Sequence, residues 1–136
     1  TNRKNYIFVE AESPNIGKNR IPHQFYKQMI ISNRIEIVRD KKLRIEELIN
    51  TYSSFTKNEL KDAVLKITKR LGPQRTKSAL DGIEKEEWEV VCNSVLEYYD
   101  KCYEYELKNK KNVKILRMGS SKDNEIIKEI LKHTQI

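Results

Sequence analysis

Residues 34–49 read Arg34-Ile-Glu-Ile-Val38, Arg39-Asp40 and then Lys41-Lys-Leu-Arg-Ile-Glu-Glu-Leu-Ile49. The first five residues alternate between polar and apolar side chains, which predicts a short strand. Asp40 is a residue type favoured at helix N-caps, and apolar residues at helical spacing follow it, so we expect a helix next. A strand that leads into a helix is the building unit of α/β proteins, so this stretch sets the fold class.

The preceding residues repeat the same order. Tyr6-Ile-Phe-Val-Glu10 is an apolar run that ends in an acid, which is typical of a buried strand in a parallel sheet. A polar loop over 13–22 and a helix over 23–31 follow, so residues 6–52 should form strand, loop, helix, strand and helix. A lone buried strand rarely opens such a domain, and the chain begins at Thr1. We therefore expect it to be part of something larger.

The following residues predict a helical insertion and a return to the sheet. Thr56 with Glu59 forms a capping box, and Gly72-Pro73 ends that helix after Leu71. Two further helices are expected, one from Gln74 to about Gly82 and one from about Glu84 to Tyr105. A strand over 113–118 and a last helix capped by Ser120 or Ser121 close the chain. The predicted organisation is an α/β core segment over 1–55, a helical subdomain over 56–107, and a returning strand and helix over 108–136.

Composition and charge narrow the class of protein. The 136 residues carry 27 Lys and Arg against 20 Asp and Glu, a net charge of +7. Residues 1–50 hold 10 basic and 6 acidic residues and residues 101–136 hold 9 and 5, so both ends are basic. No apolar run approaches the ~20 residues of a membrane span. We expect a cytoplasmic protein with an anionic partner, RNA rather than membrane, although a scattered lysine surface would give the same totals.

One cluster of candidates lies at the first predicted strand end. Glu10 and Glu12 are two apart, so on a strand they would point to the same side and could hold Mg²⁺, or simply face solvent. Gly17-Lys18-Asn19-Arg20 places two cations on a glycine-containing loop, a weak phosphate-binding signal. No complete G-x-x-x-x-G-K-[ST] motif is present, which argues against an autonomous nucleotide kinase.

A second cluster lies near the end of the long helix. Aromatic side chains interleaved with cations can stack unpaired bases while the lysines meet phosphates, or can serve as packing. We expect Tyr99 and Tyr103 to pack and Tyr98 and Tyr105 to be the freer tyrosines. Cys92 and Cys102 lack metal-ligand spacing, so we expect no zinc site and ordinary thiols. The members of this cluster are Tyr98, Tyr99, Tyr103, Tyr105, Lys108, Lys110 and Lys111.

Two blocks of residues resemble a known family. Phe8-Val-Glu-Ala-Glu-Ser13, Ile16-Gly17 and Arg20-Ile-Pro22 resemble the "F-V-E-x-E-S-x-x-I-G-x-x-x-I-P" segment of tRNA 2-selenouridine synthases. A second block resembles that family's helical region and its "Y-Y-D-x-x-Y" signature, namely Leu71-Gly72, Arg75, Trp88 and Leu96-Glu-Tyr-Tyr-Asp100 with Tyr103. The correspondence runs in order along nearly the whole chain.

The resemblance implies a fold and a reaction. Such enzymes join a rhodanese-like domain to a P-loop domain and replace sulfur by selenium in wobble 2-thiouridine, using selenophosphate through a geranylated intermediate. The chain resembles only the C-terminal part of the P-loop half, which implies a partial P-loop-type parallel sheet with an inserted helical subdomain. The rhodanese/P-loop part would belong to the same enzyme or to a split subunit, so the chain alone would be an incomplete transferase.

The resemblance also assigns candidate residues. Glu10, Glu12, Ser13, Gly17 and Arg20 match the segment that faces the phosphate site, with Lys18 beside them. They would bind a diphosphate such as geranyl diphosphate, with Mg²⁺, or position the anticodon loop. Arg75 joins the RNA-binding candidates. A stand-alone RNA-binding module, a P-loop kinase-like fragment and a homo-oligomer stay open as alternatives.

Overall fold

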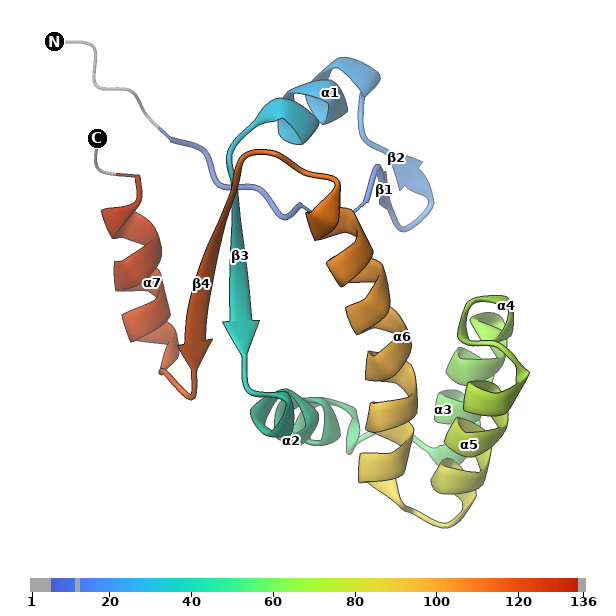
Figure 1. The fold of residues 1–136 in the computed structure, drawn as a ribbon. Coiled ribbons are helices and arrows are strands. Elements are labelled where there is room, and N and C mark those ends of the chain that lie inside the picture. Colours follow the sequence, from blue (N-terminus) through green and yellow to red (C-terminus); the bar gives the residue numbers. More distant parts are fainter. Residues whose placement is uncertain (1–5, 12, 135–136) are drawn as a thin grey trace, which may run out of the picture. The chain divides into compact units, whose positions relative to one another are not determined.

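The computed structural model describes residues 6–11 and 13–134, which divide into two compact units (Figure 1). The strand unit combines the residues up to Val38 with those from Lys111 onward. The helical unit is the continuous stretch Arg39–Lys110. The chain therefore leaves the strand unit, completes the helical unit, and then returns.

The strand unit is built around a small parallel sheet. Its elements are β1 (Asn15–Ile16), β2 (Asn19–Arg20), α1 (His23–Ile31), β3 (Arg34–Arg39, which ends at the boundary), β4 (Val113–Gly119) and α7 (Asp123–Lys132). β3 pairs with β4, and both arrows point the same way in Figure 1. The Arg34 amide donates to the Asn112 carbonyl at 2.9 Å and sets the register. The expected α/β class with a parallel sheet is confirmed at this level.

The predicted first strand is wrong. Residues 6–10 carry no strand, and Ile7 and Phe8 are 86% and 57% exposed. A strand exists only where a neighbouring strand accepts and donates its backbone hydrogen bonds. In the part of the chain that the structure describes, β3 and β4 pair with each other alone. The apolar run therefore stays outside the sheet and exposed.

The helical unit has its own core. Its elements are α2 (Lys41–Tyr52), α3 (Lys57–Lys66), α4 (Thr68–Leu71), α5 (Pro73–Glu84) and α6 (Trp88–Lys108). α5 contacts α3, α4 and α6, and α2 contacts α6. The buried cluster consists of Val64, Leu71, Ala79 and Ile83, with Trp88, Val91, Val95 and Tyr98 among the side chains packed around it. Several helices thus share one apolar centre.

Local chemistry explains the helix boundaries. The Thr56–Glu59 capping box forms as predicted and begins α3. Gly72 adopts φ +82 between α4 and Pro73, where a residue with a Cβ would be strained. The helix expected to run up to Leu71 is interrupted at Ile67, and the long helix begins at Trp88 instead of Glu84. The turn before it contains Glu86 at φ +59.

One predicted helix cap is confirmed in its position and the other is wrong. Asp40 occupies the N-cap of α2, but its side chain makes no capping hydrogen bond. The N-cap of α7 is Lys122, not Ser120 or Ser121, and its backbone amide donates to the Glu125 carboxylate at 2.9 Å. The carboxylate supplies an acceptor from within the helix, so no hydroxyl is needed at the cap.

Candidate functional site

The Gly17–Lys18 pair forms the tip of a two-residue hairpin. Asn15 pairs with Arg20 and Ile16 with Asn19, so the chain reverses between β1 and β2. Gly17 has φ +59 at the first turn position, where a two-residue hairpin of type II′ places glycine. The Ile21 amide donates to the Pro14 carbonyl at 2.8 Å, just beyond the Asn15–Arg20 pair, and this hydrogen bond holds the two ends of the hairpin together.

The Ser13 side chain forms local hydrogen bonds at the start of this hairpin. Its hydroxyl donates to the Asn15 carbonyl at 2.9 Å and accepts from the Asn15 amide at 3.0 Å. Both hydrogen bonds are local, two residues apart, and they tighten the turn into β1. Ser13 therefore shapes the loop.

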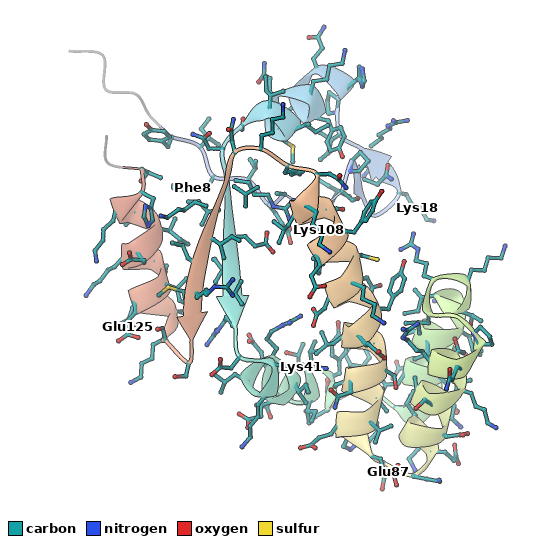
Figure 2. All side chains as sticks on the ribbon, viewed as in Figure 1. Phe8, Lys18, Lys41, Glu87, Lys108 and Glu125 are labelled. Carbon is teal, nitrogen blue, oxygen red and sulfur yellow. The ribbon has the colours of Figure 1, made fainter. Side chains whose placement is uncertain are left out.

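The two hairpin cations are available to a ligand. Lys18 and Arg20 are exposed, and neither has an ion-pair partner among the described residues. Figure 2 shows Lys18 at the hairpin turn. A Cβ placed on Gly17 would have no heavy atom within 4 Å, so the backbone at the tip is open to approach. An ammonium and a guanidinium two residues apart suit a phosphate oxygen cluster.

The acidic part of this candidate site differs from expectation. Glu10 is exposed in a segment without a strand, so the argument that it shares a strand face with Glu12 fails. Glu12 lies outside the described residues. No group of three His, Cys, Asp or Glu side chains that could hold a metal ion occurs within residues 6–11 and 13–134.

Arg75 is already paired inside the helical unit. Its Nε donates to the Glu97 carboxylate at 3.2 Å, and its Nη1 donates to the Leu71 carbonyl at 3.3 Å. The Lys101 ammonium reaches the other Glu97 oxygen at 3.4 Å. The Arg75 guanidinium, with Lys101 adding to it, lowers the pKa of Glu97. Arg75 thus joins α4, α5 and α6, and one acid is shared by two cations.

The aspartate of the tyrosine signature also has a structural partner. Asp100 accepts a bidentate pair from Arg44 of α2, with Nη2 to Oδ1 at 2.7 Å and Nη1 to Oδ2 at 3.2 Å. This fork is the strongest geometry for a guanidinium and a carboxylate. Sequence reasoning missed both Arg44 and Glu97, because nothing in the local pattern marks partners 56 and 22 residues away.

The tyrosines of the signature are mostly packing residues. Tyr98 contacts the buried cluster, and its ring lies 5.3 Å from that of Tyr99 in an edge-on arrangement. A hydrogen bond with the Cys102 side chain is the main reason that the pKa of Tyr98 is raised. The expectation that Tyr98 is one of the freer tyrosines is therefore wrong. Tyr99 and Tyr103 are half-buried, as expected for packing.

The end of α6 is different, because its aromatic side chain faces solvent. Tyr105 is 71% exposed, and Lys108 lies three residues on, one helical turn away on the same side. Figure 2 shows Lys108 at this end of the helix. Lys110 and Lys111 follow, and none of the three lysines has an ion-pair partner in the described part of the chain. The Asn109 side chain donates to the Tyr105 carbonyl at 3.0 Å and holds the helix end.

The two cysteines show no sign of a reactive pair. Both are free and half-buried, and burial raises the pKa of the Cys92 thiol. A raised pKa reduces the thiolate fraction at neutral pH, so Cys92 behaves as a packing residue.

The fold and the two cationic clusters define an α/β protein with a helical unit and separate anion-binding candidates. No helix in the described residues is long and apolar enough to cross a membrane. The model of the tRNA 2-selenouridine synthase AAA domain matches residues 1–135, and the chain belongs to this family. Neither the search of curated proteins nor that of solved structures found a match.

Proposed function

We propose that this chain is the tRNA- and diphosphate-binding portion of a tRNA 2-selenouridine synthase, working with a rhodanese/P-loop part. Family membership supports the reaction, and the small parallel sheet is compatible with a P-loop-type domain. One observation carries the binding roles. The cations of the hairpin and of the α6 end lack acidic partners among the described residues, whereas Arg75 and Arg44 are neutralised internally.

The α6 end suits single-stranded RNA. An exposed tyrosine ring offers a face on which an unpaired base stacks, worth roughly 1–3 kcal/mol. Lys108 one turn away, and Lys110 and Lys111 beyond it, would meet the phosphates that flank such a base. An anticodon loop presents unpaired bases of this kind. We therefore assign Tyr105 and Lys108 to tRNA.

The hairpin suits a compact phosphate ligand. Lys18 supplies a point charge and Arg20 a planar fork, on a turn whose glycine lets a diphosphate approach the backbone. Geranyl diphosphate is the ligand that the reaction sequence calls for.

Binding of labelled tRNA tests the first assignment. We expect wild-type protein to prefer a tRNA with a 2-thiouridine anticodon over the unmodified tRNA, with affinity falling steeply in salt. Tyr105→Ala should weaken binding about fivefold to a hundredfold, by loss of the stacking energy. Tyr52→Ala, which removes another half-exposed tyrosine, is the matched control and should leave affinity unchanged. Equal losses in the two variants would contradict the assignment.

Thermal stabilisation tests the second assignment. A ligand at a hundredfold excess over its Kd stabilises the folded state by about 2.7 kcal/mol. We expect geranyl diphosphate with Mg²⁺ to raise the melting temperature of the wild type and not of Arg20→Gln. The rival role is that of a stand-alone RNA-binding module. It would be favoured if the protein binds tRNA, if geranyl diphosphate leaves the melting temperature unchanged, and if Glu10→Gln keeps its affinity for tRNA.

A further inference from the structure

Charge is divided along the helical unit. Residues 66–77 contain five cations and no acid, whereas residues 81–89 contain five acids and one lysine. The first stretch spans the end of α3, α4 and the start of α5, and the second surrounds the turn into α6. Figure 1 shows α4 and the α5–α6 turn at opposite ends of the α3–α5–α6 group. Within this group of helices, the region around α4 is thus basic and the turn into α6 is acidic.

Five cations of this basic end are here called the α4 patch. It consists of Lys66, Lys69, Arg70, Arg75 and Lys101. Arg75 and Lys101 meet through Glu97, and the charge of Arg70 acts on Tyr98 of α6. Lys66, Lys69 and Arg70 are exposed and have no ion-pair partner among the residues that the structure describes. Glu97 is thus a single carboxylate shared by two cations of the patch.

A purely structural explanation covers only part of the patch. The last turns of α3 and α4 contain Lys66, Lys69 and Arg70. The negative end of a helix dipole stabilises cations at such positions. Arg75, in the first turn of α5, has Glu97 as its partner, but it shares that single acid with Lys101, so the pair of cations keeps a net positive charge. The dipole also gives no reason for acids to be absent from twelve successive residues. The surplus positive charge is free to attract a polyanion.

We propose that the α4 patch binds the phosphate backbone of RNA, as a second contact surface separate from the end of α6. The inference rests on the proposed function in taking this RNA to be tRNA. Backbone contacts of this kind position a nucleic acid and carry no sequence information. The patch would therefore hold a base-paired stem, while Tyr105 reads unpaired bases. Spacing between the two surfaces would select RNA with a loop and a stem.

The salt dependence of binding tests the proposal with the full chain. Lys69→Gln/Arg70→Gln removes two phosphate contacts, so the slope of log affinity against log salt should fall by about two. Affinity for tRNA near 0.1 M salt should fall about tenfold or more. Lys85→Gln/Lys128→Gln makes the same change in net charge outside the patch and should leave the slope unaltered. Circular dichroism checks the fold, and Lys66→Gln/Lys69→Gln replaces the first variant if it unfolds.

A plain RNA stem-loop without the anticodon sequence separates this proposal from the proposed function. If the wild type shows no preference for 2-thiouridine tRNA, the proposed function fails. The patch proposal still holds in that case if the wild type binds the stem-loop and the patch variant does not. If patch and control variants show the same slope with both RNAs, the patch proposal is wrong. The expected result is that the patch variant loses affinity for both RNAs, whereas the control variant keeps it.

Discussion

Thr76 shows how a single buried hydroxyl weakens the helical unit. It is 6% exposed, and its Oγ1 has no hydrogen-bond partner among the described residues. A buried hydroxyl without a partner costs about 1–3 kcal/mol of folding free energy. Thr76→Val keeps the shape and removes the polar atom. We expect it to raise the free energy of unfolding by about 1 kcal/mol, measured in urea.

Thr76→Ser is the matched control, because it keeps the hydroxyl and deletes only the methyl group. We expect it to lower the free energy of unfolding by about 1 kcal/mol through lost apolar contact. A Thr76→Val protein less stable than the wild type would show that the hydroxyl has a partner in solution.

Glu59 makes the start of α3 sensitive to pH. Hydrogen bonds from the backbone and hydroxyl of Thr56 lower the pKa of Glu59. The ionised Glu59 carboxylate therefore stabilises the fold fully above the pKa that this carboxyl has in the unfolded chain. This stabilisation is lost as the pH falls through the lower pKa of the folded protein. We expect the melting temperatures of wild type and Glu59→Gln to differ most at neutral pH and to converge below about pH 4. Curves that stay parallel down to pH 3 would contradict this.

At the scale of elements, Gly82 sets how closely α5 and α6 approach. A Cβ at this position would lie 2.9 Å from Cγ2 of Val91 and 3.4 Å from the Glu87 carbonyl oxygen. Alanine normally stabilises a helix by about 1 kcal/mol relative to glycine. Here Val91 is β-branched and stiff, so the overlap forces the helices apart. We expect Gly82→Ala to lower the free energy of unfolding by about 1–3 kcal/mol.

Val91→Ala supplies the test of that explanation. In a double-mutant cycle by urea unfolding, Gly82→Ala should cost less in the Val91→Ala background, because the clashing methyl group is gone. Additive effects would mean that the glycine is required for another reason.

Helix ends with local chemistry could be predicted from the sequence, whereas features set by distant partners could not. The Thr56–Glu59 box and Gly72-Pro73 act within a few residues, so α3 begins and α4 ends where expected. Tyr6–Glu10 has the composition of a strand, but a strand also needs a neighbour, which no local pattern reveals. The Arg44–Asp100 pair is hidden for the same reason, since it joins helices far apart in sequence.

The candidate site could be predicted only as a set of residue types. The sequence shows cations on a glycine turn and tyrosines beside lysines. It does not show which of these side chains already have an ion-pair partner or pack in the core. Arg75 and Tyr98 look like ligand-binding residues until their partners are known. Roles for Lys18, Arg20 and Tyr105 stay predictions, as does the division of the chain at 55/56 and 107/108.

At the scale of the whole molecule, the two units differ in how much core they contain. Six of the buried apolar residues lie in the helical unit, namely Ile45, Val64, Leu71, Ala79, Ile83 and Leu96. Leu116 and Ile126 are the buried apolar residues in the described strand unit. We expect a fragment of residues 39–110 to fold by itself, with a helical circular dichroism spectrum and a cooperative melt.

Leu71→Ala in that fragment is its control, because it removes a side chain that is 1% exposed. It should abolish the cooperative transition or lower its midpoint steeply, as truncation of a buried leucine costs about 2–5 kcal/mol. A melt without a transition in the unmodified fragment would mean that the helical unit depends on the rest of the chain.

The pairing of β3 with β4 has a consequence for biosynthesis. β3 leaves the ribosome first and must wait for the whole helical unit before its partner is made. At roughly 5–20 residues per second, about 70 intervening residues occupy several seconds. During this interval the growing chain presents the open backbone edge of β3, a target for chaperones and for neighbouring nascent chains. Synonymous codons that slow translation between β3 and β4 should therefore lower the yield of folded protein in the cell.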